Sequence, residues 1–307
     1  MTSPRSPKRP EPKSVTSHLE GDYGYLRLSG FNEKATDETL AAINALKAKN
    51  PNMKGLILDL RNNPGGLLDQ AVAVGDVFLD GGEVVSQRGR DAQDIERYNA
   101  KPGDLLHGIP IVTVINSGTA SAAEIVAGAL QDRHRAQTIG LTSFGKGSVQ
   151  SVIPLRGGAD GALKLTTARY YTPSGRSIQK TGITPDLEVA ETKEQAQLIA
   201  NKTFQFSEAS FRNALNADEG KARVAPHAVA EAPPANFDEK DGDFQLQRAL
   251  AVLKAGSVQT LLTTEKTTGS AVQVVAQAKT ESGPDKAAAP PATSKPPTPP
   301  EVVKPKH

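Results

Sequence analysis

The sequence of 307 residues has no cysteine and no tryptophan, and aromatic residues make up only 4% of it. Without cysteine, the chain can form neither disulfide bonds nor thiolate metal sites. It also lacks an uninterrupted apolar run of about 18 residues, the length that a membrane-spanning helix requires. The formal net charge of +2 is close to balance, so overall charge favours binding of neither nucleic acid nor an anionic membrane.

Both ends of the chain are poor in the apolar residues that a folded core needs. Residues 1–17 form a basic, proline-rich arm, and residues 266–307 form a tail rich in Ala, Pro and Lys. Such segments cannot offset the entropy lost on ordering, so we expect both to be disordered. The arm also lacks the apolar stretch of a signal peptide. We assign residues 18–222 to the folded core and residues 223–265 to a linker with a short docking helix.

Within the core, strand-like apolar runs alternate with helical patterns. Strands are predicted at residues 25–28, 55–60, 82–88, 109–115 and 137–140, a polar loop at 89–107, a hairpin at 149–169, and helices at 36–49, 69–79, 122–130, 192–215 and 244–254. Strands separated by helices form a mostly parallel sheet with helices on both faces. Because the hairpin adds antiparallel strands, we predict an α/β fold with a mixed, mostly parallel sheet.

Ser121 lies where a predicted strand turns into a predicted helix. The strand at residues 109–115 is followed by the turn sequence Asn-Ser-Gly, and the helix begins at Ala122. Backbone N–H groups in the first turn of a helix have no partner within it, so they can stabilise negative charge on an oxygen beside the serine. Taken alone, Ser121 also fits an ordinary helix N-cap.

A serine nucleophile needs a base that takes its proton. None of the histidines lies in a sequence pattern typical of that base; they are His18, His107, His134, His227 and His307. A Ser-His-Asp triad stays open, because its members need not be neighbours in the chain. The alternative base is Lys146, which lies between two glycines. Lysine acts as a base only when neutral, so we expect Lys146 to be buried beside apolar groups that lower its pKa.

Several motifs in one order resemble the carboxy-terminal processing (tail-specific) proteases of peptidase family S41. They are GTASAAE at residues 118–124, FGKGSVQ at 144–150, LDLRNNPGGLL at 58–68, FNE at 31–33, ARYYTPSGR at 168–176 and GITPD at 182–186. The resemblance covers residues 24–189, with weaker echoes at 245–250. It implies a serine endopeptidase with a ClpP/crotonase-like core that cleaves proteins near their C-termini through an acyl-enzyme. It implies no cofactor and no metal.

The resemblance also implies a role for each site residue. Ser121 would be the nucleophile, Lys146 the general base and later the general acid, and Gln150 the group that orients the lysine. The oxyanion hole would combine the backbone N–H of Ala122 with that of Gly65 or Gly66, and the choice between the two glycines stays open. Glycine suits this position because a Cβ would obstruct the approach of a backbone amide to the reacting carbonyl.

A competing interpretation is a nucleotide-binding phosphate loop. Residues 140–146 satisfy the first seven positions of G-x-x-x-x-G-K-[ST], but Gly147 occupies the eighth position, where the motif has a hydroxyl that binds magnesium. A phosphate loop also opens a helix, whereas residues 148–155 have the pattern of a strand. A catalytically silent fragment, or a scaffold that binds protein chains through an exposed sheet edge, is the other alternative.

The resemblance implies protein or peptide substrates with apolar C-terminal tails, and a place in the periplasm or cell envelope with a link to signal transduction. Family members usually carry an export signal and a peptide-binding PDZ domain before the core, and this chain enters the core near Tyr23. A complete sequence would therefore be cytoplasmic. A truncated gene product, an engineered fragment or a minimal family member would each explain the missing region.

Overall fold

The computed structural model describes residues 13–91, 93–200, 207–216, 231–268 and 273–274. The chain divides into two units, Met1–Gln277 and Ala278–His307. The second unit lies outside the described residues, as do residues 1–12 of the predicted arm. Within the predicted tail, residues 266–268 end a helix and residues 273–274 form a short strand, so its predicted disorder is wrong there and is not tested beyond residue 274. The fold described below is that of the first unit.

The first unit is built around a six-stranded sheet in the order β1-β2-β3-β6-β7-β10. Neighbouring strands from β2 to β10 run parallel, and β1 pairs antiparallel with β2. The bounds are β1 (Val15–Glu20), β2 (Tyr23–Leu28), β3 (Gly55–Asp59), β6 (Ile111–Ile115), β7 (Ala136–Gly140) and β10 (Leu187–Glu188). The predicted α/β fold with a mostly parallel sheet is confirmed.

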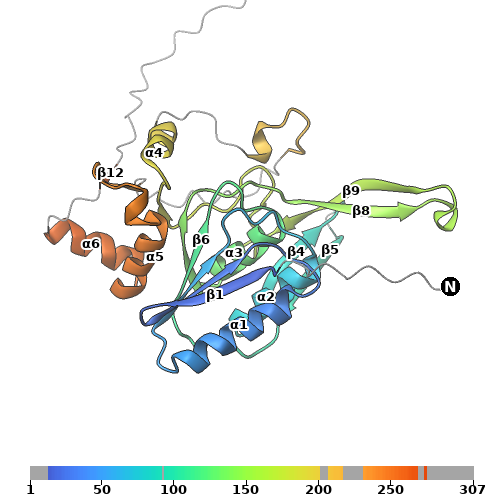
Figure 1. Ribbon diagram of the computed structural model, residues 1–307. Helices are drawn as coiled ribbons and strands as arrows, with labels where there is room; N and C mark the ends of the chain where they lie inside the picture. The colour runs from blue at the N-terminus through green and yellow to red at the C-terminus, as the bar shows by residue number, and fades with distance from the viewer. Residues whose placement is uncertain (1–12, 92, 201–206, 217–230, 269–272, 275–307) are drawn as a thin grey trace, which may run out of the picture. The chain divides into compact units, whose positions relative to one another are not determined.

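Helices cover both faces of this sheet, as predicted (Figure 1). On one face, Leu56 and Leu58 of β3 pack in a core with α1 (Ala35–Lys49), α2 (Leu68–Phe78) and α3 (Ala122–Asp132). On the other face, Ile57 packs in a core with α5 (Phe244–Ala255) and α6 (Val258–Thr268). Strand side chains alternate between the faces, so a strand buried on both faces is a continuous apolar run.

A second, four-stranded sheet has the order β5-β4-β9-β8, and all its pairs are antiparallel. Its strands are β4 (Gly82–Arg88), β5 (Ile95–Ala100), β8 (Ser148–Pro154) and β9 (Ala162–Tyr171). The hairpin of β8 and β9 projects beyond the rest of the sheet (Figure 1). The remaining elements are α4 (Lys193–Ala200), β11 (Glu231–Ala232), β12 (Gln273–Val274), and the short 3-10 helices η1 (Arg156–Gly158), η2 (Glu208–Ser210) and η3 (Glu239–Asp241).

The structure corrects several predicted elements. The loop predicted at residues 89–107 contains β5, an edge strand whose mostly exposed polar residues hide the apolar alternation of a strand. Residues 15–17, which we assigned to the arm, belong to β1. Helix α6 lies in the region assigned to the linker and tail, where its threonines weaken the apolar pattern. Within the described residues, no helix has both the length and the apolar character to cross a bilayer.

The helix predicted at residues 192–215 is also wrong in part. Helix α4 ends at Ala200, and the described segment 207–216 contains only η2. Phe204 and Phe206 of this predicted helix lie outside the described residues. Its third phenylalanine, Phe211, is 50% exposed, and its ring centroid lies 6.1 Å from that of Phe144. Segment 207–216 therefore docks beside the loop that precedes β8 and does not continue a helix.

A buried charge network fixes α5 to the carboxyl end of β3. The fully buried Asp59 accepts hydrogen bonds from Tyr25 Oη and from Arg61 Nη2, each over 2.6 Å. Arg61 also donates to Asp243 and to Gln245 of α5. Burial alone would raise the pKa of Asp59, but hydrogen bonds and charge from Arg61 outweigh it and lower that pKa. Burial and Asp59 together raise the pKa of Tyr25 to about 12.

Candidate active site

Ser121 has a strained backbone at the turn between β6 and α3, where the sequence predicts it. Its φ is 55° and its ψ is −118°, a region that costs a residue with a side chain on the order of 1–3 kcal/mol. The side chain is half-buried, and Glu124 fixes the turn by accepting the Ser121 N–H over 2.8 Å. Such strain persists only where the surroundings enforce it, and it is common at functional sites.

The loop after β3 packs directly against this turn. The N–H of Ala120 donates to the carbonyl of Asn63 over 2.9 Å. Gly65 has a φ of +96°, and a Cβ built on it would lie 2.8 Å from both the Ser121 Cβ and the Ala122 nitrogen. Only glycine fits here, both for its conformation and for the close approach. The structure thus brings together Ser121, Ala122 and the glycine loop.

The backbone amides around Ser121 differ in whether they are already hydrogen-bonded. The N–H of Gly65 donates to Oδ1 of Asn63 over 2.9 Å. Within the described part of the chain, the N–H groups of Gly66 and Ala122 donate to no acceptor. Gly66 packs closely against Phe31, because a Cβ on it would lie 2.2 Å from the Phe31 carbonyl oxygen. Two free amides therefore lie near the serine.

Sequence reasoning missed Glu124, which joins the Ser121 turn to the lysine loop. Its carboxylate is fully buried and accepts four hydrogen bonds. Oε2 accepts the N–H groups of Ser121 and Lys146, and Oε1 accepts the Ser143 hydroxyl and the Gly145 N–H. Burial raises the pKa of Glu124 to about 7, although these hydrogen bonds favour the ionised form. An acidic residue in an apolar helix was the available signal.

The side chains of Lys146 and Gln150 form no hydrogen bond with Ser121 among the described residues. Both are exposed, and among the hydrogen bonds of the described residues none joins the Lys146 ammonium to Ser121 or to Gln150. The expected burial of Lys146 is therefore wrong. Hydrogen bonds fix the backbone of this loop, whereas the lysine side chain extends into solvent, and Gln150 is paired with Thr166 in the β8–β9 ladder.

Gln179 is a second residue that the motifs did not reveal. It is fully buried, and its Oε1 accepts the N–H of Gly147 over 3.0 Å. Its Nε2 donates to Glu208 Oε1 and to the Leu215 carbonyl, each over 3.2 Å. A Cβ on Gly147 would lie 2.4 Å from the backbone nitrogen of Gln179. Gln179 therefore links the glycine loop around Lys146 to segment 207–216, a long-range contact with no pattern in the sequence.

The alternative bases and sites find little support in the geometry. Within the described residues, no hydrogen bond joins a histidine to Ser121; His18 instead pairs with Glu20 in β1. Residues after Lys146 form β8 and not the helix that a phosphate loop opens. No group of three or more His, Asp or Glu in the described part of the chain is placed to hold a metal ion.

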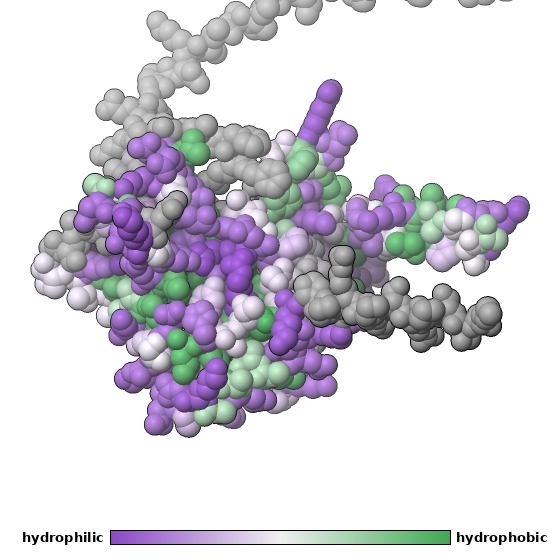
Figure 2. Space-filling model, in the orientation of Figure 1, coloured by the Kyte–Doolittle hydropathy of each residue, from purple (hydrophilic) through white to green (hydrophobic). Residues whose placement is uncertain are grey.

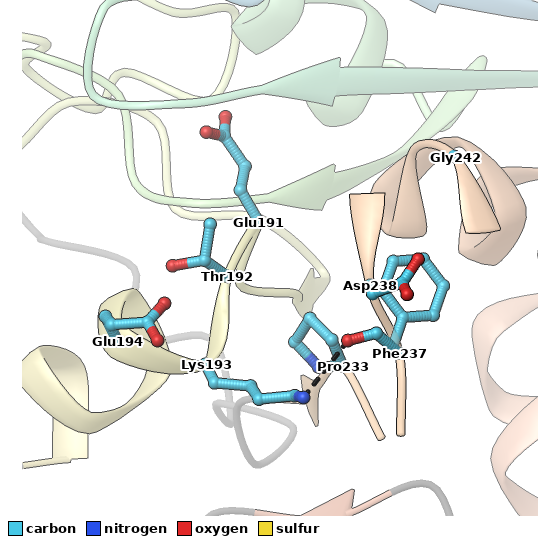
Figure 3. A pocket seen from close by; sticks show the side chains of 8 residues that line it. All are labelled: Glu191, Thr192, Lys193, Glu194, Pro233, Phe237, Asp238 and Gly242. Carbon is cyan, nitrogen blue, oxygen red and sulfur yellow. Dashed lines mark hydrogen bonds between the residues drawn. The ribbon is translucent and has the colours of Figure 1, made fainter. Parts of the chain in front are cut away.

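A hollow of about 290 Å³ lies between the segments around residues 191–194 and 233–242 (Figure 3). Lys193 crosses it and donates from Nζ to the Phe237 carbonyl over 3.1 Å. Its lining residues mix charges of both signs, and none of the predicted site residues is among them. The hollow is therefore separate from the candidate active site.

Comparisons with known proteins agree with this geometry. The sequence profile of peptidase family S41 matches residues 22–189. A carboxy-terminal-processing protease of Bartonella bacilliformis is 59% identical over 181 residues, which are 58% of this chain and 41% of that protein. A carboxyl-terminal-processing protease of Synechocystis sp. is 42% identical over 168 residues, which are 55% of this chain and 38% of that protein.

Among solved structures, a photosystem II D1 C-terminal processing protease matches with a TM-score of 0.52 and 35% identity, over 57% of this chain and 48% of that chain. The structure has a strained serine at a strand-to-helix turn, beside a glycine loop with a free amide. This chain belongs to peptidase family S41. It spans about two fifths of the length of the curated relatives that it matches.

Proposed function

We propose that the chain is a serine endopeptidase in which Ser121 is the nucleophile and Lys146 the base. The observation that carries this proposal is the position of Ser121, in a strained turn beside the amide of Ala122 and the glycine loop. A nucleophile beside preorganised amides is the arrangement that acyl transfer needs.

The reaction then follows in two steps. Ser121 Oγ attacks the peptide carbonyl carbon, and its proton passes to Nζ of neutral Lys146. The C–N bond breaks as Lys146 returns that proton to the leaving amine, which leaves an ester on Ser121. Water attacks this ester with Lys146 again as the base, and the new carboxyl terminus leaves as the serine regains its proton. Gln150 would orient Lys146 during these transfers.

For the oxyanion hole we propose the amides of Ala122 and Gly66. Gly65 is adjacent to Ser121, but its N–H is already donated to Asn63. Gly66 follows directly and its N–H has no acceptor among the described residues. Two amides that each donate to the developing oxyanion are worth on the order of 10²–10³ in rate per donor.

Lys146 is exposed in this structure. A polypeptide bound across the loop would cover the lysine and exclude water from it. The same exposure is the observation that favours the second candidate, a catalytically silent fragment that binds protein chains. We further propose, from the family resemblance, substrates with apolar C-terminal tails and a place in the periplasm or cell envelope.

The test is labelling of the chain with a fluorophosphonate, which reacts with activated serines. We expect labelling of the wild type, none of Ser121→Ala, and strongly reduced labelling of Lys146→Ala. If all three folded proteins remain unlabelled in the presence of a bound polypeptide, the silent-fragment alternative holds.

A further inference from the structure

The hairpin of β8 and β9 carries an unusual concentration of exposed apolar side chains. Figure 2 shows a green patch on the hairpin where it projects from the molecule. Half of the large hydrophobic side chains that are exposed in the described part of the chain lie on this hairpin: Val152, Ile153, Leu155, Leu163 and Leu165. A two-stranded ribbon has little core of its own, so an apolar surface on it calls for an explanation.

Most of these side chains share one face of the hairpin. Ile153 is paired with Leu163, and Ser151 with Leu165. Strand residues two apart point to the same side, so Ile153, Leu155, Leu163 and Leu165 form one surface, which we call the hairpin face. Their exposed fractions lie between 38% and 47%.

The hairpin face continues the side of the sheet that faces the main core. By the same alternation, Val149 lies on this side of β8, and it packs against the core. Four residues further along the strand, the core no longer covers this side, and Ile153 is exposed. The opposite side of the hairpin is more polar, with Gln150, Lys164 and Thr166, although it also carries the exposed Val152. The apolar surface therefore lies mainly on one side and begins at the core.

The outer backbone edge of β8 is also unpaired. In the sheet order β5-β4-β9-β8 this strand is at the edge, and no other strand among the described residues pairs with it. The N–H of Leu155 donates across the hairpin to the Gly161 carbonyl over 2.9 Å. Antiparallel residues alternate between facing the partner strand and facing away, so Pro154, Val152 and Gln150 direct their backbone groups outward.

This edge has a defined length and position. Pro154 has no N–H, so it limits an added strand at one end. Val152 and Gln150 each present both an N–H and a carbonyl. At the other end, β8 begins at Ser148, two residues after Lys146. An extended chain paired with β8 would therefore run directly to the loop that carries the candidate base.

We propose that the outer edge of β8 and the hairpin face together form a docking surface for an extended segment of polypeptide substrate with apolar side chains at alternate positions. That the docked polypeptide is a substrate rests on the proposed function. Backbone pairing with the edge would supply affinity for any extended chain, and alternate apolar side chains would contact the hairpin face.

The size of the surface favours a single strand over a second copy of this protein. Stable protein–protein interfaces bury about 800 Å² on each partner and involve roughly 20–30 residues a side. The hairpin face consists of four side chains and a short strand edge. An extended peptide of about six residues matches this edge, since it spans Ser148–Pro154.

The test measures binding in the Ser121→Ala background, where no cleavage occurs. The probe is a fluorescent peptide that alternates valine and threonine, followed by anisotropy. Val152→Pro removes one outward N–H, and the matched control Val152→Ala shortens the same side chain but keeps that N–H. We expect Val152→Pro to bind the peptide at least about five-fold more weakly than Val152→Ala, the typical effect of one hydrogen bond.

A second pair of variants tests the hairpin face without a backbone change. We expect Leu163→Thr with Leu165→Thr to weaken binding by about ten-fold, the effect of removing two apolar contacts, and Lys164→Thr on the opposite side to leave it unchanged. Thermal unfolding shows whether each variant folds. Equal peptide binding by all folded variants would overturn the proposal. So would loss of a concentration-dependent dimer in Val152→Pro with peptide binding intact, because that result assigns the surface to a second copy.

Fluorophosphonate labelling separates this inference from the proposed function. Labelling without added polypeptide reports on Ser121 alone, whereas in an otherwise wild-type chain Val152→Pro should slow cleavage of an unstructured protein through a raised KM relative to Val152→Ala. If the wild type does not label at all, the proposed function fails, and the anisotropy experiment still decides the docking surface.

Discussion

The backbone N–H groups of Ser121 and Lys146 donate to the same oxygen, Oε2 of Glu124, each over 2.8 Å. The candidate nucleophile and the candidate base lie 25 positions apart in the sequence, and one buried carboxylate fixes the backbones of both. The other oxygen of Glu124 holds Ser143 and Gly145. The lysine loop is therefore positioned relative to the serine turn even though the lysine side chain is exposed.

The first prediction concerns Glu124→Gln. An amide has one acceptor oxygen instead of two and turns an NH₂ group toward backbone donors, so at least one pair of hydrogen bonds is lost. Hydrogen bonds to a charged group are worth about 1.5–3 kcal/mol, so we expect kcat to fall on the order of 10- to 100-fold with little change in KM. The control is Glu38→Gln, because Glu38 also accepts two backbone N–H groups, from Ser14 and Val15, away from the site. Equal losses in both variants would contradict a positioning role.

The second prediction is a dependence of stability on pH. Burial raises the pKa of Glu124 from 4.5 in the unfolded reference to about 7. Between these values the folded state binds a proton that the unfolded state has lost. Stability from this group is therefore complete below about pH 4.5 and is lost as pH rises through 7. Chemical unfolding from pH 4.5 to 8 should show wild type losing up to about 3 kcal/mol relative to Glu124→Gln. If the difference in the free energy of unfolding between the wild type and Glu124→Gln stays constant across this pH range, the raised pKa of Glu124 is refuted.

The third prediction concerns the glycine loop. An alanine at Gly65 would place its Cβ 2.8 Å from Ser121 Cβ and from the Ala122 nitrogen. We expect Gly65→Ala to abolish fluorophosphonate labelling. Gly21→Ala is the matched control, because Gly21 also has a positive φ, +61°, but a Cβ there meets nothing within 4 Å. It should lose about 1–2 kcal/mol of stability and keep full labelling. Labelling of a folded Gly65→Ala would argue against the assigned oxyanion site.

The fourth prediction concerns the charge network under α5. Removing one partner of a buried ion pair leaves the other charge uncompensated and costs about 3–5 kcal/mol. We therefore expect Arg61→Met to lower the free energy of unfolding by that amount, since Asp59 is fully buried. Lys54→Met is the control, because the pair of Lys54 with Asp22 has side chains that are 64% and 58% exposed; it should change stability by less than about 1 kcal/mol. Unfolding in urea measures the free energy of unfolding of Arg61→Met and Lys54→Met and distinguishes the two losses.

The sequence predicts the fold well where burial leaves a strong pattern. Strands such as β3 and β6 are continuous apolar runs because they are covered on both faces, and the motif order identifies the family. Strand β5 and helix α6 escape prediction because polar and threonine-rich residues face water there. Pattern alone cannot find an element that tertiary pairing stabilises.

In the candidate site, too, some features follow from the local sequence and others from tertiary contacts. The turn at Ser121 and the need for glycine at residue 65 follow from local geometry, and both are present. Glu124 was visible only as an acidic residue in an apolar helix, and most of the groups that Glu124 and Gln179 bind lie 19–36 positions away, so the sequence does not indicate their roles. The exposure of Lys146 was not predictable either, because burial depends on which other parts of the protein cover a loop.

The most direct test of the central claim compares cleavage of an unstructured protein with an apolar C-terminus by the wild type, Ser121→Ala and Lys146→Ala, each confirmed as folded by thermal unfolding. The account predicts that only the wild type cleaves and that an acyl-enzyme ester forms on Ser121. Cleavage by Ser121→Ala at the wild-type rate would contradict the account.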